Sequence, residues 1–232
     1  ILRRTVGHVK AVDGVDVTVR EGHTVGVVGE SGSGKTTLAM GLLRLERSEG
    51  PITFHGTRID GFNFKQMRPL RKEMQVVFQD PFSSLNPRKR VIDIITEAPI
   101  FHGLIARKQK NEFAAEMLQR VGLDPDTLQR YPHQFSGGQR QRIGIARALA
   151  VSPELLVCDE SIAALDVSIQ AQIINLFVKL RDEFTLTYLF ISHDIGVIEH
   201  ISDRVIVMYL GRIVETAPIS SFLQTPNHPY TK

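Results

Sequence analysis

TVGVVGESGSGKTTLAMGLLRL, residues 24 to 45, is the stretch that decides the fold. Residues 24–29 form an apolar run that predicts a buried strand, and residues 36–45 carry leucines at the spacing of one helix face. Between them, GESGSGKTT satisfies G-x-x-x-x-G-K-[ST] in the strand, loop and helix order which that pattern requires. The stretch therefore predicts a loop that holds phosphate groups.

The glycines of this loop let successive backbone amides point at phosphate oxygens, and the following helix adds its positive N-terminal end. Lys35 supplies a positive charge between the outer phosphates, and Thr36 offers a hydroxyl to Mg²⁺, an ion that prefers oxygen ligands. The pattern leaves open which nucleotide binds, and whether hydrolysis, phosphoryl transfer or binding alone follows. The candidate nucleotide-binding residues are Gly29, Glu30, Ser31, Gly32, Ser33, Gly34, Lys35, Thr36 and Thr37.

LLVCDE, residues 155–160, predicts a second part of the same site. An apolar strand that ends in two carboxylates places them at the C-terminal edge of a sheet, where ligands bind in such folds. Because successive residues of an extended segment face opposite ways, we expect Asp159 near the metal and Glu160 free to orient an attacking water. Without the glycine loop, ordinary capping would explain the pair. Together with the loop, the pair favours hydrolysis.

Strand and helix patterns alternate along the rest of the chain. Residues 15–19 alternate apolar and polar as in a half-exposed strand, and MQVVF, LLVCD and TYLFIS are suited to a parallel sheet covered on both faces. RVIVMYLGRIVETA reads as two strands joined at Leu210 and Gly211. A helical stripe capped by Asp166 or Ser168 follows LLVCDE. The stripe consists of Ile169, Ile173, Leu176 and Leu180. This alternation predicts a doubly wound α/β core.

The composition is ordinary for a folded globular protein. Hydrophobic residues make up 42% of the chain, and 28 basic residues stand against 25 acidic ones. Basic runs at 88–90 and 107–110 lack interleaved aromatic residues, so we interpret them as solvated faces and expect no nucleic-acid partner. The one cysteine, Cys158, excludes an intramolecular disulfide and any four-cysteine metal site.

Neither a membrane span nor a signal peptide is predicted. No window approaches eighteen uninterrupted apolar residues, and the N-terminal residues contain no apolar stretch like that of a signal peptide. We therefore expect a chain that neither crosses a membrane nor is secreted. Because the chain begins at Ile1 and not at Met, and stops just after HPYT, we also expect a fragment of a longer polypeptide.

FSGGQRQR, residues 135–142, precedes the apolar helical run IGIARALA. Its serine is placed as a helix cap, and its two glycines expose free amides to an anion. One phosphate-binding loop already serves one nucleotide. The simplest hypothesis is therefore that this second anion site serves a nucleotide held by another copy.

The order of these motifs resembles the ABC ATPases, in which S-G-G-Q precedes an apolar strand ending in Asp-Glu. In that family two cassettes pair head to tail, and each ATP lies between the phosphate loop of one cassette and the signature serine and glycines of the other. The resemblance implies that the signature residues of this chain contact ATP held by the partner cassette. These residues are Ser136, Gly137, Gly138 and Gln139.

Other elements of that family match in the same order. Gln79, after MQVVF, is similar to the Q-loop glutamine, which implies contact with Mg²⁺ and communication with membrane subunits. His193, after TYLFIS, is similar to the switch histidine near the γ-phosphate. Asp166 lies in ALD, which resembles the loop that couples the two sites, and Glu160 resembles the general base. By this resemblance the Mg²⁺ ligands are Thr36, Gln79 and Asp159.

The resemblance also implies the architecture. We expect an α/β fold built on a P-loop NTPase core with a mainly parallel sheet, an N-terminal antiparallel β subdomain and a helical subdomain insertion. The chain would be a single nucleotide-binding domain, with its core at about residues 1–80 and 151–232 and its helical subdomain at about residues 81–150.

Two short sequence motifs resemble those of one subfamily. QDPFSSLNPR, which starts at Gln79, and NHPYT, residues 227–231, are similar to phrases of oligopeptide, dipeptide and nickel uptake ATPases. The resemblance implies an ATP-hydrolysing importer subunit, peripheral on the cytoplasmic face of the bacterial inner membrane. Integral permease subunits would bind it directly, and an extracytoplasmic solute-binding protein would act indirectly. The solute class rests on this resemblance alone.

The sequence departs from that family at two places. Ser161 and Ala163 stand where these importers usually carry proline and serine, which frees local backbone and removes a hydroxyl at the cassette interface. In addition, no obvious aromatic residue precedes Val9 to stack on adenine, so we expect that residue upstream of Ile1.

Three alternatives stay open. A soluble ABC ATPase of DNA repair or translation shares every nucleotide motif, but it usually carries a coiled-coil, zinc-bearing or tandem insertion that is not visible here. A phosphate-loop kinase leaves the SGGQ motif without a purpose. A binding-only module would result if Ser161 and Ala163 impair turnover.

Overall fold

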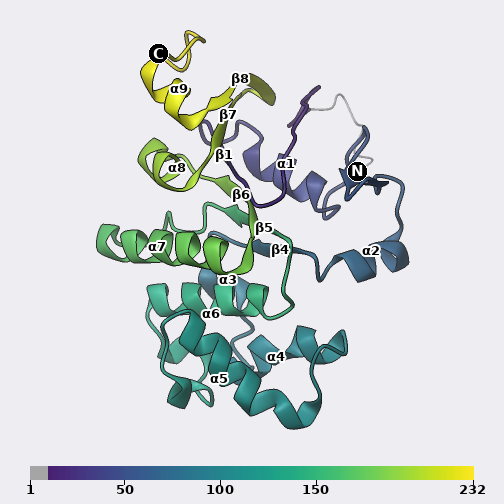
Figure 1. Cartoon of the computed structure of the whole chain (residues 1–232), viewed down its shortest axis with the longest axis vertical. Helices are drawn as coiled ribbons and strands as arrows, with labels where there is room; N and C mark the ends of the chain where they lie inside the picture. Colours follow the sequence, from purple (N-terminus) through teal and green to yellow (C-terminus); the bar gives the residue numbers. More distant parts are fainter. Residues whose placement is uncertain (1–9) are drawn as a thin grey trace, which may run out of the picture.

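The apolar runs of the sequence form one six-stranded sheet at the centre of the molecule (Figure 1). The computed structural model describes residues 10–232, apart from the side chains of residues 81 and 82. The strands of this sheet are β1 Thr24–Val28, β4 Met74–Val77, β5 Leu155–Asp159, β6 Thr187–Ile191, β7 Arg204–Tyr209 and β8 Arg212–Pro218. Their order is β4-β5-β6-β1-β7-β8, and each pair is parallel except β7 and β8. The mainly parallel sheet predicted from the sequence is confirmed.

Layers on both faces cover the central parallel strands, which is why the middle residues of β1, β5 and β6 are buried and carry no charge. In β5, Leu156 and Cys158 face one layer, whereas Val157 faces the other. The second layer contains α1, Lys35–Leu42, and the first contains most of the other helices (Figure 1). Val157 is fully buried. Burial of such an aliphatic side chain stabilises the fold by about 1.5–3 kcal/mol.

The first layer is built from consecutive helices. These are α3 Pro81–Ser84, α4 Val91–Phe101, α5 Lys110–Arg120, α6 Gly137–Leu149, α7 Val167–Phe184 and α8 Ile195–Ile201. The stretch from residue 81 to residue 150 contains no strand in the part that the structure describes, so its predicted helical character is confirmed. Its division from the core as a separate subdomain stays a prediction.

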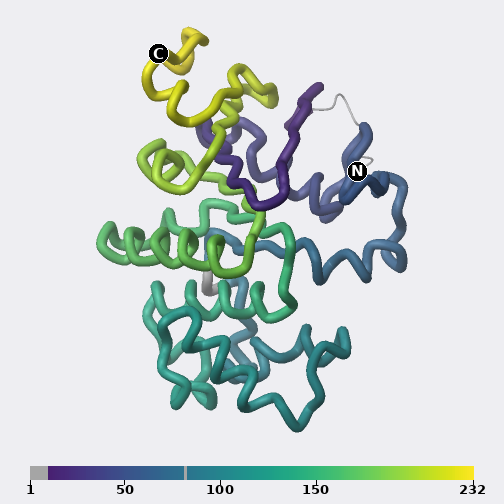
Figure 2. The backbone as a smooth tube through the Cα atoms, viewed as in Figure 1, coloured from purple at the N-terminus to yellow at the C-terminus, as the bar shows by residue number. Residues whose placement is uncertain are grey.

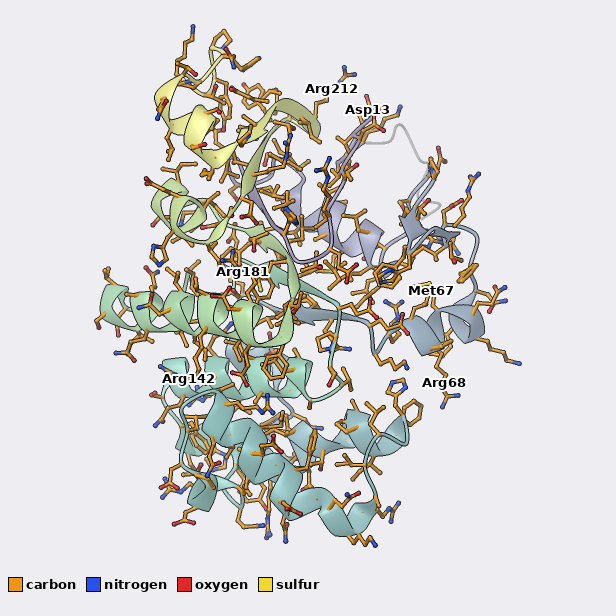
Figure 3. The ribbon with its side chains drawn as sticks, in the orientation of Figure 1. Asp13, Met67, Arg68, Arg142, Arg181 and Arg212 are labelled. Atoms are coloured by element: carbon orange, nitrogen blue, oxygen red, sulfur yellow. The ribbon has the colours of Figure 1, made fainter. Side chains whose placement is uncertain are left out.

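Two arginines join these helices (Figure 3). Arg142 of α6 donates to the Val121 carbonyl at 2.7 Å and to the Gln172 side chain at 3.1 Å, which ties the end of α5 to α6 and α7. Arg181 of α7 donates to the Ile201 carbonyl at 3.1 Å, at the end of α8. Hydrogen bonds from charged donors to buried carbonyls each contribute about 1.5–3 kcal/mol.

Several short elements were not assigned from the sequence. They are the hairpin strands β2 Thr53–Phe54 and β3 Thr57–Arg58, the helices α2 Phe64–Leu70 and α9 Ile219–Gln224, and the 3-10 turns Arg107–Gln109, Pro125–Thr127 and Pro132–Gln134. α2 has a signal that could have found it, because Asn63 and Gln66 form a capping box at its start.

Residues 15–19, predicted as a strand, pair with no other strand among residues 10–232. Val15, Val17 and Val19 are half-buried against the layer that contains α1, and the residues between them are exposed, so only the predicted alternation is confirmed. No backbone ladder joins this segment to another among the described residues. A strand needs a hydrogen-bonded partner as well as the right pattern. In this part of the chain, the antiparallel structure that the residues show is the β2–β3 hairpin.

The first helix ends earlier than predicted. α1 stops at Leu42, because Arg44 adopts a left-handed backbone with a φ of 54° that a right-handed helix cannot continue. Leu45 is consequently 48% exposed and does not share the buried face of Leu38.

The turn predicted at Leu210 and Gly211 is confirmed. Their φ angles are 46° and 80°, as expected for a two-residue hairpin turn with positive φ at both central positions. The Gly211 carbonyl accepts from the Asp13 amide at 2.8 Å, and Arg212 donates to the Asp13 carboxylate at 2.9 Å (Figure 3). These bonds fasten the N-terminal segment, purple in Figure 2, to the β7–β8 hairpin.

Candidate functional site

The predicted phosphate-binding loop lies between β1 and α1, and three of its glycines adopt left-handed backbone angles. φ is 153° at Gly29, 80° at Gly32 and 100° at Gly34. A Cβ at Gly29 would lie 2.2 Å from the Met208 carbonyl oxygen, and a Cβ at Gly34 would lie 2.2 Å from the carbonyl oxygen of Ala11. Glycine is therefore required at both positions by close packing as well as by backbone conformation.

We expect Gly34→Ala to be much more damaging than Gly32→Ala. A Cβ at Gly32 meets no atom within 4 Å, so that change costs only the left-handed backbone penalty of about 1–2 kcal/mol. At Gly34 the methyl group must also displace the Ala11 backbone, so ATP binding should be lost. Urea unfolding and calorimetric ATP titration of both variants would measure this. Equal unfolding midpoints and equal ATP affinities would contradict the assignment of Gly34.

Most side chains of the loop face solvent. Ser33 is the exception besides Lys35, and its hydroxyl is buried without a hydrogen-bond partner in the described part of the chain. The Ser33 carbonyl accepts a hydrogen bond from the Gly211 amide at 3.0 Å, so the β7–β8 turn contacts the backbone of the loop. The exposed positions of the loop are Glu30, Ser31, Gly32, Thr36 and Thr37.

Lys35 is folded back onto its own loop. Its Nζ donates to the Gly29 carbonyl at 2.7 Å and to the Glu30 carbonyl at 2.8 Å, and the residue is only 4% exposed. Burial lowers the pKa of Lys35, whereas Glu160 and Asp159 raise it. The ammonium group is therefore held by two backbone carbonyl oxygens, and a phosphate oxygen can replace them as its hydrogen-bond acceptor.

The ends of β1 and β5 bring the loop and the carboxylates together. The Thr36 hydroxyl donates to Asp159 Oδ1 at 3.0 Å. Asp159 is 6% exposed, and burial raises the pKa of its carboxyl while the hydrogen bond from Thr36 lowers it. Both side chains offer oxygen atoms, which suits a hard divalent cation.

Glu160 and His193 meet at the ends of neighbouring strands. Glu160 has a φ of 46°, and its amide donates to the Ile191 carbonyl of β6 at 3.0 Å. Its Oε1 lies 4.0 Å from Nδ1 of His193, which follows β6 and whose side chain is 60% exposed. The left-handed turn at Glu160 is unusual for a non-glycine residue and directs the chain away from the sheet directly after β5.

Two predicted site residues lie apart from this cluster. Gln79 is exposed in the bend after β4, and the structure shows no hydrogen bond from it to Thr36 or Asp159. Asp166 is exposed at the N-cap of α7, and its side chain accepts no capping hydrogen bond. Their predicted roles are not visible in the contacts of a single chain.

The SGGQ motif forms the start of α6, as predicted. Ser136 Oγ accepts from the Gln139 amide at 3.3 Å, and Gln139 Oε1 accepts from the Ser136 amide at 2.9 Å, which is a capping box. A Cβ at Gly138 would lie 2.5 Å from Ile169 of α7, so only glycine lets α6 and α7 approach this closely. α6 packs in the layer opposite α1.

Comparison with known families identifies this arrangement. Residues 12–163, which include both motifs, match the family model described as ABC transporter. The chain belongs to the ABC transporter family. It is an ABC-type ATPase domain, as predicted from the order of its motifs.

Curated relatives of this ABC domain carry transport names. The oligopeptide transport ATP-binding protein AppF of Bacillus subtilis is 53% identical over 234 residues, which cover 100% of this chain and 71% of AppF. The peptidoglycan transport ATP-binding protein YejF of Agrobacterium fabrum is 49% identical over 233 residues, and the match covers 100% of this chain but only 43% of YejF. The chain therefore spans about seven tenths of one relative and less than half of the other.

A solved structure matches the whole ABC fold. An ATP-binding cassette described as a dimer in a post-hydrolysis state, bound to ADP and Pi, has a TM-score of 0.84 and 27% identity. The match covers 94% of both chains. This likeness confirms the P-loop NTPase fold. None of the helices in residues 10–232 combines the length and apolar character that a membrane crossing requires.

One contact of the ABC domain's loop was missed from the sequence. The hydroxyl of Tyr230, in the NHPYT segment, accepts from the Glu30 amide at 3.3 Å. NHPYT resembles a motif of peptide uptake ATPases, but nothing in this motif indicates a contact with a loop 200 residues away.

Proposed function

We propose that this chain is the ATP-hydrolysing subunit of an ABC importer, and that it couples ATP binding and hydrolysis to the uptake of peptides or a related small solute. The observation that carries the proposal is the meeting of the loop residues Lys35 and Thr36 with Asp159, beside Glu160 and His193. AppF and YejF are named for transport of oligopeptides and of peptidoglycan, which supports a peptide-like solute.

ATP would lie on the loop between β1 and α1. Its phosphates would accept hydrogen bonds from the loop amides, and the start of α1 would add favourable electrostatics. Lys35 would exchange the Gly29 and Glu30 carbonyls for phosphate oxygens. Because these carbonyls already hold the ammonium group inside the loop, only a small movement of the side chain is needed.

Mg²⁺ fits the donors at the end of β5. The side-chain oxygens of Thr36 and Asp159 lie 3.0 Å apart, and both can coordinate a metal ion. Among the described residues, the buried carboxyl of Asp159 accepts no hydrogen bond from a cationic side chain. We propose Thr36 and Asp159 as ligands, with Gln79 as a third by its family resemblance. When bound, the ion would neutralise charge on the transferred phosphate.

Glu160 is proposed as the general base. Its carboxylate would accept a proton from a water as the water oxygen bonds to the γ-phosphorus and the bond to the ADP oxygen breaks. The products are ADP and inorganic phosphate. His193 lies 4.0 Å from this carboxylate, which supports our proposal that it orients Glu160, and its family resemblance suggests contact with the γ-phosphate.

A second cassette would complete each site. Ser136, Gly137, Gly138 and Gln139 begin α6, in the layer opposite α1, so we propose that these residues serve a nucleotide bound to another copy or a paralogue. The dimeric state of the similar solved cassette supports this pairing. Asp166 would lie at the same interface. This chain would lie peripherally on the cytoplasmic face of the bacterial inner membrane, where integral permease subunits would receive its motion and a solute-binding protein would act indirectly.

The alternatives fit less well. AppF and YejF give no support to a soluble ATPase of DNA repair or translation, because both are named for transport. A phosphate-loop kinase has no use for the capped start of α6. A binding-only module would require that Ser161, which is buried, or Ala163 prevents turnover, and phosphate release tests this directly.

Purification of the full-length protein from solubilised host membranes tests the proposal. We expect integral membrane subunits to co-purify, and we expect phosphate release in reconstituted vesicles to rise when a peptide mixture and the solute-binding protein are added. Recovery without membrane subunits, together with stimulation by DNA or ribosomes, would favour the soluble ATPase instead. A phosphorylated acceptor without free phosphate would indicate a kinase.

A further inference from the structure

The NHPYT segment is anchored on one buried carboxylate. It follows α9, yellow near the C-terminus in Figure 1, and packs against β8 through Glu215, which is 8% exposed. The Glu215 carboxylate accepts from the Asn227 amide at 3.0 Å, the Asn227 side chain at 3.4 Å, the His228 amide at 3.1 Å and the Thr231 hydroxyl. These hydrogen bonds, that from Thr231 above all, lower the pKa of Glu215 to about 2. The anchor is therefore charged at neutral pH.

Hydrogen bonds within the segment fix the position of Tyr230. The Tyr230 amide donates to Nδ1 of His228 at 3.1 Å, and the Thr231 amide donates to the His228 carbonyl at 2.9 Å. The Tyr230 ring packs on Tyr209 of β7, with ring centroids 4.5 Å apart. Both sides of the tyrosine are thus held, by a closed turn and by an aromatic neighbour.

This arrangement points the Tyr230 hydroxyl at the phosphate-binding loop. The hydroxyl accepts from the Glu30 amide at 3.3 Å, while the Glu30 carbonyl accepts from Lys35 at 2.8 Å. The two peptide groups that flank the Glu30 Cα are therefore held from opposite ends, one by Tyr230 and one by Lys35. When Lys35 turns to a phosphate, the bond to Tyr230 is the one that stays.

We infer that Tyr230 is a positioning residue for the phosphate-binding loop, held in place by the NHPYT turn and its anchor Glu215. The inference rests on the proposed nucleotide role of that loop. A loop that is ordered before ATP arrives loses less conformational freedom on binding, so the brace should raise ATP affinity. A hydrogen bond of this kind corresponds to about a threefold to tenfold change in the dissociation constant.

The test compares Tyr230→Phe with Tyr209→Phe in the full-length protein. Each change removes one hydroxyl from the same ring pair, but the Tyr209 hydroxyl makes no hydrogen bond in the part of the chain that the structure describes. Without nucleotide, we expect faster amide hydrogen exchange across residues 29–35 in Tyr230→Phe only. With ATP and Mg²⁺, we expect its calorimetric dissociation constant to rise about threefold to tenfold, with Tyr209→Phe unchanged.

A second variant, Thr231→Val, keeps the Tyr230 hydroxyl but removes one donor to Glu215, so it should shift the same two readouts in the same direction. Wild-type exchange and affinity in Tyr230→Phe would overturn the inference. Tyr230→Phe would also overturn the inference if its faster exchange extended to β8 and α9 and its unfolding temperature fell, because Tyr230 would then only stabilise the fold. Failure of the wild type to bind ATP would refute the proposed function, whereas loop exchange without nucleotide still tests the brace.

Discussion

Glu160→Gln is expected to reduce steady-state phosphate release by about 100-fold or more, because general-base catalysis typically contributes 10²–10⁴-fold. ATP affinity should stay near that of the wild type, since Lys35, Thr36 and the loop amides are untouched. Glutamine has the same shape as glutamate and keeps the hydrogen bond from the backbone amide of residue 160 to the Ile191 carbonyl, so the turn after β5 should be retained. The change therefore removes the proton acceptor and little else.

Glu199→Gln is the matched control for this prediction. Glu199 is an exposed carboxylate on α8, outside the cluster at the ends of β5 and β6. The control should hydrolyse ATP at the wild-type rate. Phosphate release and calorimetric ATP binding should be measured on all three proteins. Full turnover in Glu160→Gln would show that another group takes the proton, whereas loss of ATP binding would indicate that Glu160 contributes to the binding site itself.

The parts of the fold that were predictable from the sequence are those in which one local pattern has one physical solution. The short apolar runs at β5 and β6 favour strands buried on both faces, and both strands are almost wholly buried. The phosphate-binding loop from Gly29 to Thr37 could also be predicted, because its glycines, its lysine and the flanking strand and helix occur together. The SGGQ motif was predicted as a capped helix start for the same reason, and its capping box is present.

What could not be predicted depends on partners that are distant in sequence. Residues 15–19 have the alternation of a strand, but the pattern does not say which segment pairs with them, and no partner strand lies among residues 10–232. The predicted end of α1 is wrong because no sequence pattern around Arg44 indicates that this residue adopts a left-handed backbone. Tyr230 was missed because its contact with Glu30 depends on the hairpin β7–β8 and the anchor Glu215, which position it only in the folded chain.

Ser136→Asp, introduced into the Glu160→Gln protein, should abolish ATP-dependent dimerisation while ATP binding to the single chain persists. Aspartate is as good a helix cap as serine, so α6 should stay intact, but it adds a negative charge to the proposed partner phosphate site. Two like charges about 4 Å apart repel by about 4 kcal/mol at an effective dielectric constant near 20. At each site this repulsion corresponds to roughly 1000-fold weaker association of the two chains, so the dimer should not form.

Ser136→Asn separates charge from shape, because asparagine also caps the helix and has the size of aspartate without its charge. In analytical ultracentrifugation with ATP, Glu160→Gln should sediment as a dimer, the added Ser136→Asn should weaken that dimer modestly, and the added Ser136→Asp should leave monomers. Equal dimerisation of the two double variants would remove Ser136 from the partner site. If Ser136→Asp instead weakened ATP binding by the monomer, the serine would belong to the nucleotide of its own chain, and the proposed assembly of each site from two copies would be wrong.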